Sequence, residues 1–205
     1  MGGGINNGYS YGDHAFDDQL NQGGPLTLTN STISGNTAIE GGGMLANGNS
    51  QANITFCTIY GNAATQEGGG IAIVAYKTNQ PSQVEMRNSL VAGNHAGIGP
   101  DISGMLTSGG YNLIQNVSGA TYIPNKQHFT DVPVNPHTDL RIDPELSGKL
   151  TQIHALLSGS PVIDRIPLAA CHPNSITTDQ RGMKRPDGNE ILCDIGAFEY
   201  VDSST

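Results

Sequence analysis

The chain has 205 residues and a formal net charge of −9, from 9 lysines and arginines against 18 aspartates and glutamates. This acidic balance argues against a nucleic-acid partner or an anionic membrane surface, both of which attract basic faces. Its 28 glycines exclude a mainly helical protein, and no apolar run approaches the roughly 20 residues of a membrane span. Only 13% of the residues are charged, a composition typical of secreted proteins with neutral hydrogen-bonding surfaces.

The N-terminal residues already lie inside a repeated pattern. Met1 is followed by GGGINNG, which matches the end of a repeat found further along the chain. No signal peptide precedes Gly2. We therefore expect the chain to be a fragment of a longer protein.

An insertion at residues 6–24 carries Asp13, His14, Asp17 and Asp18. Carboxylates are the ligands that Ca²⁺ prefers, but the segment lacks the regular Asp/Asn/Gly spacing of a calcium loop. We predict a polar surface loop with no metal or other cofactor, and keep bound Ca²⁺ as the alternative. A second insertion follows at residues 76–83.

Three eleven-residue segments align without gaps: LTLTNSTISGN at 26–36, ANITFCTIYGN at 52–62 and VEMRNSLVAGN at 84–94. Their glycines, Gly35, Gly61 and Gly93, are 26 and 32 residues apart. A period of this size, with insertions between the copies, is typical of a solenoid.

Apolar and polar positions alternate within each segment, which predicts a strand with one buried face. Equivalent positions of the three segments form apolar columns. The first two columns, Leu26/Ala52/Val84 and Leu28/Ile54/Met86, belong to this strand. After a short break comes a third column, Ile33/Ile59/Val91, which predicts a second strand. The glycine column predicts a corner with positive φ. Beside it, Asn36, Asn62 and Asn94 are expected to hydrogen-bond from one repeat to the next as an asparagine ladder.

Further strands are expected after the GGG runs at 41–43 and 68–70, where glycines permit a tight corner. Strands of successive repeats would pair in parallel, with the apolar columns filling the interior. The pattern therefore predicts an all-β parallel β-helix over residues 1–116. A leucine-rich repeat would need a denser leucine framework, and a propeller would need longer, aromatic-rich blades.

Residues 117–205 lack this repeat and are predicted to form a C-terminal cap packed on the end of the β-helix. Their last part contains HALLSGSPVID at 154–164, DQRGMKRPDG at 179–188 and CDIGAFEY at 193–200. These three phrases closely resemble the C-terminal segment of large bacterial surface proteins. That family comprises right-handed parallel β-helix repeat proteins, described as polymorphic-outer-membrane-protein-like or as carrying a choice-of-anchor domain.

The resemblance implies a right-handed β-helix, an extracellular or cell-surface location and a C-terminal segment that closes the helix. The family supplies no catalytic residues to carry over. An open end would expose strand edges and apolar side chains. Residues expected to cover it are Leu146, Leu150, Ile153, Leu156, Leu157, Val162, Ile163, Ile191, Ile195 and Phe198.

Charged groups of the cap suggest an ion pair. Arg181 has Asp179, Asp187 and Asp194 nearby in sequence, so a buried pair that joins the final loop to the cap and a solvated surface pair are both open.

Three cysteines are present. Cys171 and Cys193 bracket loop-like sequence, and an extracellular protein can close it with a disulfide worth roughly 3 kcal/mol. Cys57 aligns with Ser31 and Ser89 and is expected to stay a buried free thiol. A zinc site is disfavoured because there is no Cys-x-x-Cys pair.

No catalytic cluster is evident, so the catalytic residues are unknown. Glu40 and Glu67 occupy near-equivalent corners, Glu85 and Arg87 are single, and the histidines are scattered, with His95 expected at an exposed corner. We predict a non-catalytic extracellular module of a bacterial cell-surface protein, acting in adhesion or contact with extracellular carbohydrate. The alternative is a carbohydrate-active lyase or hydrolase, which would need convergent carboxylates in a groove, or Ca²⁺ beside a basic residue.

Overall fold

The computed structural model describes residues 4–8, 23–74, 82–124, 131–188 and 190–202. Asp13, His14, Asp17 and Asp18 lie outside the described residues, as does most of the insertion at 76–83. The described chain is almost entirely β-structure, most of it in parallel strands.

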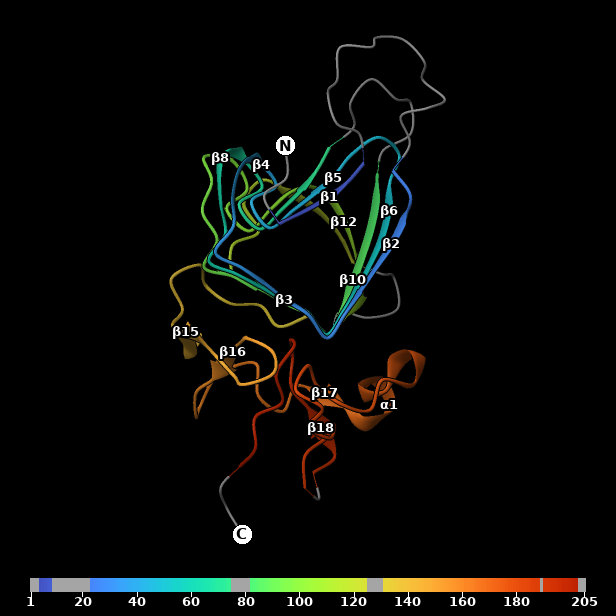
Figure 1. Cartoon of the computed structure of the whole chain (residues 1–205), viewed down its shortest axis with the longest axis vertical. Coiled ribbons are helices and arrows are strands. Elements are labelled where there is room, and N and C mark those ends of the chain that lie inside the picture. Colours follow the sequence, from blue (N-terminus) through green and yellow to red (C-terminus); the bar gives the residue numbers. More distant parts are fainter. Residues whose placement is uncertain (1–3, 9–22, 75–81, 125–130, 189, 203–205) are drawn as a thin grey trace.

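Two parallel rows of strands come from successive repeats and meet on one long strand, β12 (Ile102–Gly110), in an eight-stranded sheet (Figure 1). The first row contains β1 (Ile5–Asn7), β5 (Met44–Ala46) and β9 (Ile71–Ile73). The second row contains β2 (Pro25–Thr29), β6 (Gln51–Thr55) and β10 (Gln83–Arg87). A further strand, β14 (Ala120–Pro124), pairs in parallel with β12, so parallel pairing continues beyond residue 116.

A third row forms a separate parallel sheet of β3 (Thr32–Ser34), β7 (Thr58–Tyr60), β11 (Leu90–Ala92) and β13 (Leu113–Ile114). A short parallel pair, β4 (Thr37–Glu40) with β8 (Ala63–Glu67), completes the repeats. Seen down the stack, the rows enclose a common interior (Figure 1).

The strand registers confirm the alignment of the three segments. Leu26 pairs with Ala52 and Ala52 with Val84, and the next apolar column continues from Leu28 through Ile54 to Met86. Ile33, Ile59 and Val91 are partners in the third row. Each apolar column therefore runs through successive repeats at one height.

These columns form the interior core. Its buried members come from all three rows and include Ile33, Met44, Ile54, Cys57, Ile59, Ile71, Val84, Met86, Val91, Ile102, Leu106 and Ile114. Ile5, Leu26 and Leu28 pack against it but are only partly buried, because β1 and β2 are the outermost strands of their rows.

Glycines make the corners possible. Gly35, Gly61 and Gly93 have φ of 69°, 65° and 64°, a region that residues with a Cβ rarely adopt. In the GGG runs the reason is close approach: a Cβ at Gly43 would lie 2.7 Å from the carbonyl oxygen of Gly70. The recurring phrase thus reflects a corner that each repeat makes at the same point.

The C-terminal segment is built from small antiparallel pairs. One pair is β15 (Ile142–Ser147) with β16 (Ile153–Leu156), and the other is β17 (Ile166–Pro167) with β18 (Leu192–Cys193). A four-residue helix, α1 (Leu168–Cys171), and a 3₁₀ turn, η1 (Pro173–Ser175), lie between the strands of the second pair.

This segment lies against the outer face of the third row (Figure 1), whereas the sequence analysis places it over the end of the stack. The difference has a physical cause. Val91 points into the core, so its neighbours Leu90 and Ala92 point outward, and both are fully buried. A strand with apolar residues on both faces must be covered on both sides.

A second apolar core fills this junction. It joins Phe56, Leu90, Ala92 and Leu113 of the repeats to Leu140, Ile142, Ile153, Leu156, Val162, Ile166, Ile195 and Phe198 of the C-terminal segment. Hydrogen bonds reinforce it: Thr32 Oγ1 donates to Gln180 Oε1 at 2.7 Å, and the Ala197 amide donates to Thr58 Oγ1 at 3.0 Å.

Ten apolar residues of this segment are expected from the sequence to cover the end of the β-helix, and that prediction is wrong for four of them, whose side chains are exposed. Ile153, Leu156, Val162, Ile195 and Phe198 are buried, and Ile163 is partly buried. Leu146, Leu150, Leu157 and Ile191 are instead exposed, Leu150 to 99%. Leu150 lies in the turn between β15 and β16, and its side chain is in solvent.

Candidate functional site

A groove runs over the outer face of the second row, where the segment around η1 meets the repeats. Its volume is about 290 Å³, and it is lined by Thr27, Asn53, Ile54, Thr55, Glu85, Arg87 and Asn174. Thr27, Asn53 and Glu85 are register partners on successive strands, so their side chains form one column across the groove. The sequence analysis does not place Asn174 here, because its approach depends on how the C-terminal segment packs.

The groove suits a neutral polar ligand. Glu85 is its single carboxylate and lies 3.8 Å from Arg87, with both side chains well exposed. Exposed pairs of this kind contribute little to stability. A glycosidase uses two carboxylates on opposite sides of the scissile bond, and the residues lining this groove do not supply them.

Glu40 and Glu67, the other glutamates singled out from the sequence, are register partners in β4 and β8. Glu67 Oε2 accepts a hydrogen bond from Ser103 Oγ at 2.8 Å, which ties it to the next repeat. His95 is exposed, as expected.

A serine–histidine pair, absent from the sequence analysis, joins β3 to β16. Ser34 Oγ lies 2.6 Å from His154 Nε2, and His154 Nδ1 lies 2.9 Å from the carbonyl oxygen of Asp143. Because a carbonyl only accepts, Nδ1 carries the proton, and in the neutral imidazole Nε2 accepts from the serine hydroxyl. The two residues are 120 positions apart, so spacing along the chain gives no signal for the pair.

Ser34 borders a cavity of about 370 Å³. Acyl-transfer enzymes combine such a pair with free donors that hold the oxyanion. Asn36, an amide side chain of the cavity wall, already donates to Ser34 O at 3.2 Å and to Asn62 Oδ1 at 3.0 Å. His154 is also only 3% exposed. We interpret the pair as a bridge that fixes the C-terminal segment to the third row.

The asparagines form a hydrogen-bonded row through the repeats. The backbone N–H and side-chain Nδ2 of Asn36 donate to Asn62 Oδ1, each at 3.0 Å, and those of Asn62 donate to Asn94 Oδ1 at 2.9 and 3.0 Å. Asn94 Nδ2 then donates to Asp101 Oδ1 at 2.8 Å. A carboxylate ends this row well because it accepts without needing to donate.

Asp101 is nearly fully buried, and burial raises its pKa to about 6, against the hydrogen bonds from Asn94 and Asn116. Its contribution to stability is therefore fully present below its ordinary pKa of 3.8 and is lost as pH rises through about 6. The rise in the pKa of Asp101 from 3.8 to about 6 corresponds to about 3 kcal/mol.

We expect Asp101→Asn to remove this pH dependence. Urea unfolding at pH 4.5 and pH 7.5 should show a smaller change in the free energy of unfolding for the variant than for the parent chain. Glu145→Gln, an exposed glutamate of β15, is the matched control and should behave as the parent. Equal pH dependence of parent and Asp101→Asn would contradict this account of Asp101.

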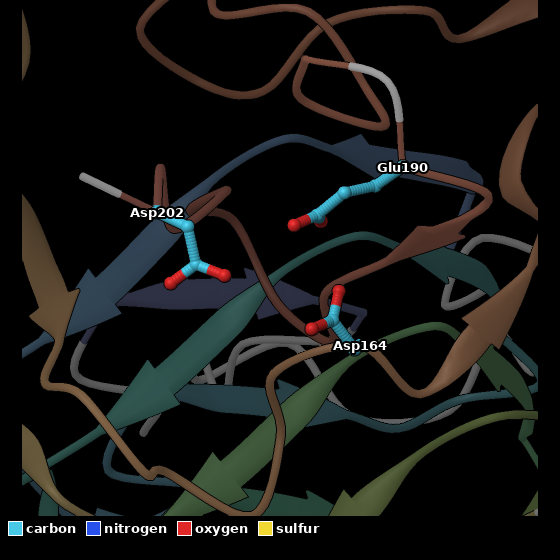
Figure 2. Close-up of side chains that lie close together, drawn as sticks. All are labelled: Asp164, Glu190 and Asp202. Carbon is cyan, nitrogen blue, oxygen red and sulfur yellow. The ribbon is translucent and has the colours of Figure 1, made fainter. Parts of the chain in front are cut away.

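Three carboxylates gather in the C-terminal segment at a place the sequence analysis does not predict. One oxygen each of Asp164, Glu190 and Asp202 lies within 4.8 Å of the others (Figure 2). They come from the turn before β17, the loop before β18 and the C-terminal tail. In the described part of the chain, these three carboxylates lie close enough together to share one metal ion.

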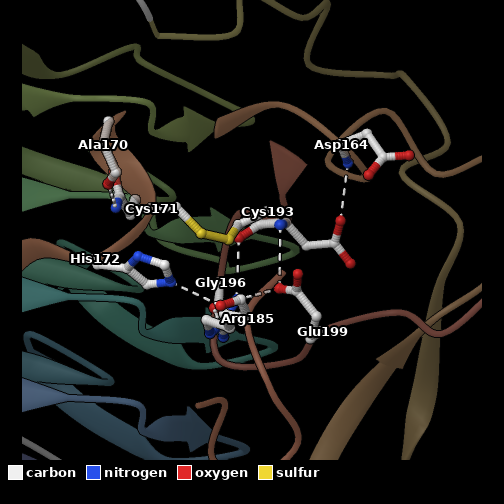
Figure 3. Close-up of a disulfide and its surroundings, with 10 residues drawn as sticks. Asp164, Ala170, Cys171, His172, Arg185, Cys193, Gly196 and Glu199 are labelled. Carbon is white, nitrogen blue, oxygen red and sulfur yellow. Dashed lines mark hydrogen bonds and ion pairs between the residues drawn. A yellow bond between two sulfur atoms is a disulfide. The ribbon is translucent and has the colours of Figure 1, made fainter. Parts of the chain in front are cut away.

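Cys171 and Cys193 are joined by a disulfide that links α1 to β18, as the sequence analysis expects (Figure 3). Their Cα atoms are 5.8 Å apart, within the usual range for disulfides. Cys57 is a buried free thiol, and burial raises its pKa to about 12. It is therefore unreactive as a nucleophile.

Beside the disulfide, Arg185 is fully buried and forms an ion pair with Glu199 at 2.6 Å (Figure 3). It also donates to the carbonyl oxygens of Asp194 and Gly196, and its guanidinium lies 4.2 Å from the Phe56 ring centre. Burial raises the pKa of Glu199 to about 8 and lowers the pKa of Arg185. The charge of Arg185 acts to lower the pKa of Glu199, and the charge of Glu199 acts to raise the pKa of Arg185. Burial is the larger effect on both.

Arg181, for which the sequence suggests an ion pair, forms one that is less buried than the Arg185–Glu199 pair. Arg181 contacts Asp179 at 2.7 Å, with the arginine partly exposed and the aspartate buried, and donates to the Glu199 carbonyl oxygen. It does not pair with Asp187 or Asp194 in the described contacts. The buried arginine of this segment is thus Arg185, which the sequence analysis does not single out, and its partner is Glu199.

Within the described ranges, no helix has the length and hydropathy that a membrane span requires. Comparison of the chain with protein-family models, curated proteins and solved structures yields no match.

Proposed function

We propose that this chain is a right-handed parallel β-helix serving as a non-catalytic extracellular module of a bacterial cell-surface protein, and that it contacts carbohydrate through the groove on the second row. The in-register parallel rows support the architecture. The resemblance of the C-terminal phrases to bacterial β-helix surface proteins motivates the location.

The groove is the observation that carries the carbohydrate proposal. It presents hydroxyl and amide groups on strands about 4.8 Å apart, close to the length of one sugar unit, so successive strands can meet successive sugars. None of its lining residues is aromatic, so contact depends on hydrogen bonds that compete with water. We expect weak binding, with a dissociation constant on the order of 1 mM.

Amide chemical-shift titration with neutral oligosaccharides tests this proposal. The amides of Asn53 and Thr55 should shift, and Asn53→Ala should weaken binding on the order of tenfold. Gln83→Ala is the matched control, since Gln83 is exposed on β10 but does not line the groove. An absence of shifts at 10 mM sugar (about ten times the expected constant) would refute carbohydrate contact here.

The same samples also test the alternative function, that of a carbohydrate-active enzyme. We expect the oligosaccharide to remain intact after a day at room temperature. Cleavage that disappears in Glu85→Gln would replace the binding module with an enzyme that uses the groove's carboxylate.

A further inference from the structure

The carboxylates of Asp164, Glu190 and Asp202 are held in place by the backbone around them. Asp194 Oδ1 accepts from the backbone N–H of Asp164 at 2.8 Å, and its Oδ2 accepts from the backbone N–H of Tyr200 at 2.6 Å. One buried carboxylate therefore fixes both the turn that carries Asp164 and the tail that carries Asp202. The β17–β18 pair connects the same turn to the loop before β18.

A fourth carboxyl group supplies an independent observation. Asp187 is 8% exposed, and its Oδ1 has no hydrogen-bond partner among the described residues. The Asp187 side chain lies within hydrogen-bonding reach of the Glu190 carboxyl group, which belongs to the cluster. A buried carboxylate oxygen that faces another carboxylate and lacks a donor is a position that favours a cation.

No side-chain cation serves this cluster in the described part of the chain. The ion pairs there use Arg87, Arg181 and Arg185, whose partners are Glu85, Asp179 and Glu199. Arg165, next to Asp164 in sequence, directs its Nε to the carbonyl oxygen of Pro161. Among the described residues, the carboxyl groups of the cluster therefore face one another without a basic side chain paired to them.

We propose that Asp164, Glu190 and Asp202 bind one Ca²⁺ ion, with Asp187 as the adjoining buried carboxylate. The donors are all oxygens, which excludes the nitrogen and sulfur ligands that zinc prefers. Oxygens on opposite sides of Ca²⁺, bound at about 2.3–2.6 Å, lie roughly 5 Å apart, in keeping with the 4.8 Å limit here. Mg²⁺ retains several waters and uses one or two carboxylates, so it fits this set less well.

The ion ties the C-terminal tail to the disulfide-bearing part of the segment. Asp202 lies in the tail, while Asp164 and Glu190 flank strands β17 and β18. Ca²⁺ binding therefore stabilises the region that covers the outer face of the third row. This site is distinct from Asp13, Asp17 and Asp18, the acidic residues considered from the sequence.

Calorimetric titration of the chelator-treated full chain with CaCl₂ tests the site. We expect one ion per chain and, at a hundred times the dissociation constant, a rise in melting temperature of about 5–10 °C. Asp164→Asn and Asp202→Asn should each weaken Ca²⁺ binding at least about tenfold. Asp202 is exposed in the tail, so its substitution leaves the fold intact.

Glu145→Gln makes the same change of charge at an exposed site of the segment and should bind as the parent does. MgCl₂ at equal concentration should bind more weakly. The proposal is overturned by an absence of binding at 10 mM CaCl₂ (well above the 10⁻⁴–10⁻³ M range of extracellular calcium modules). It is equally overturned by unchanged affinity in Asp164→Asn and Asp202→Asn, which would locate the ion elsewhere.

Discussion

A chain that ends at residue 138 is expected to aggregate. The truncation uncovers the outer face of the third row, where Phe56, Leu90 and Leu113 are fully buried. Burial of one such side chain stabilises a protein by about 1.5–3 kcal/mol, so these three together contribute roughly 5–9 kcal/mol. That is comparable with the whole stability of a typical domain. Light scattering and thermal melts measure the outcome.

A rescue variant identifies the cause. In the truncated chain, Leu90→Thr and Leu113→Thr should restore solubility, because threonine suits a strand and tolerates water. Removing residues 1–24 from the full chain should cause less aggregation and a smaller loss of stability, since β1 is the only described strand within those residues. A soluble, folded monomer from the unmodified truncation would show that residues 139–205 are a separate domain.

Substitution of Arg185 by Met is expected to cost about 3–5 kcal/mol, because Glu199 is left as a buried carboxylate without its partner. The double variant Arg185→Met with Glu199→Gln should be less destabilised. It loses the same contacts of the guanidinium with Phe56 and the carbonyl oxygens, but it carries no unpaired charge.

Urea unfolding at pH 9 measures both variants under conditions where Glu199 is ionised in the parent chain. The difference between the single and double variants isolates the cost of the unpaired carboxylate. If Arg185→Met is no less stable than the double variant, the ion pair is not what holds this part of the segment.

Particular residues show how far the sequence predicts the fold. Leu28, Ile54 and Met86 share a column in the alignment and are register partners in the structure, because a stack repeats its geometry at a fixed period. The glycine corners and the row of asparagines follow from the same repetition. The disulfide was expected from the loop-rich sequence around its cysteines.

The C-terminal segment was less predictable because it does not repeat. Its position beside the third row depends on the outward residues Leu90, Ala92 and Leu113, whose apolar character indicates a covered outer face but not which segment covers it. Arg185 with Glu199, and Asp164 with Asp202, meet through turns whose geometry is not encoded in any period. Asp101 precedes β12 at the repeat position of Gly43 and Gly70, where the earlier repeats have no side chain, so the alignment gives no precedent for a carboxylate there.

Interstrand contacts between backbone protons, measured by nuclear magnetic resonance on the full chain, test the central claim most directly. In-register parallel stacking predicts contacts linking Leu28 to Ile54, Ile54 to Met86, and Ile59 to Val91. Contacts shifted by one or more residues, or an antiparallel pattern between these segments, would contradict the stacked repeats on which the groove and the covered outer face depend.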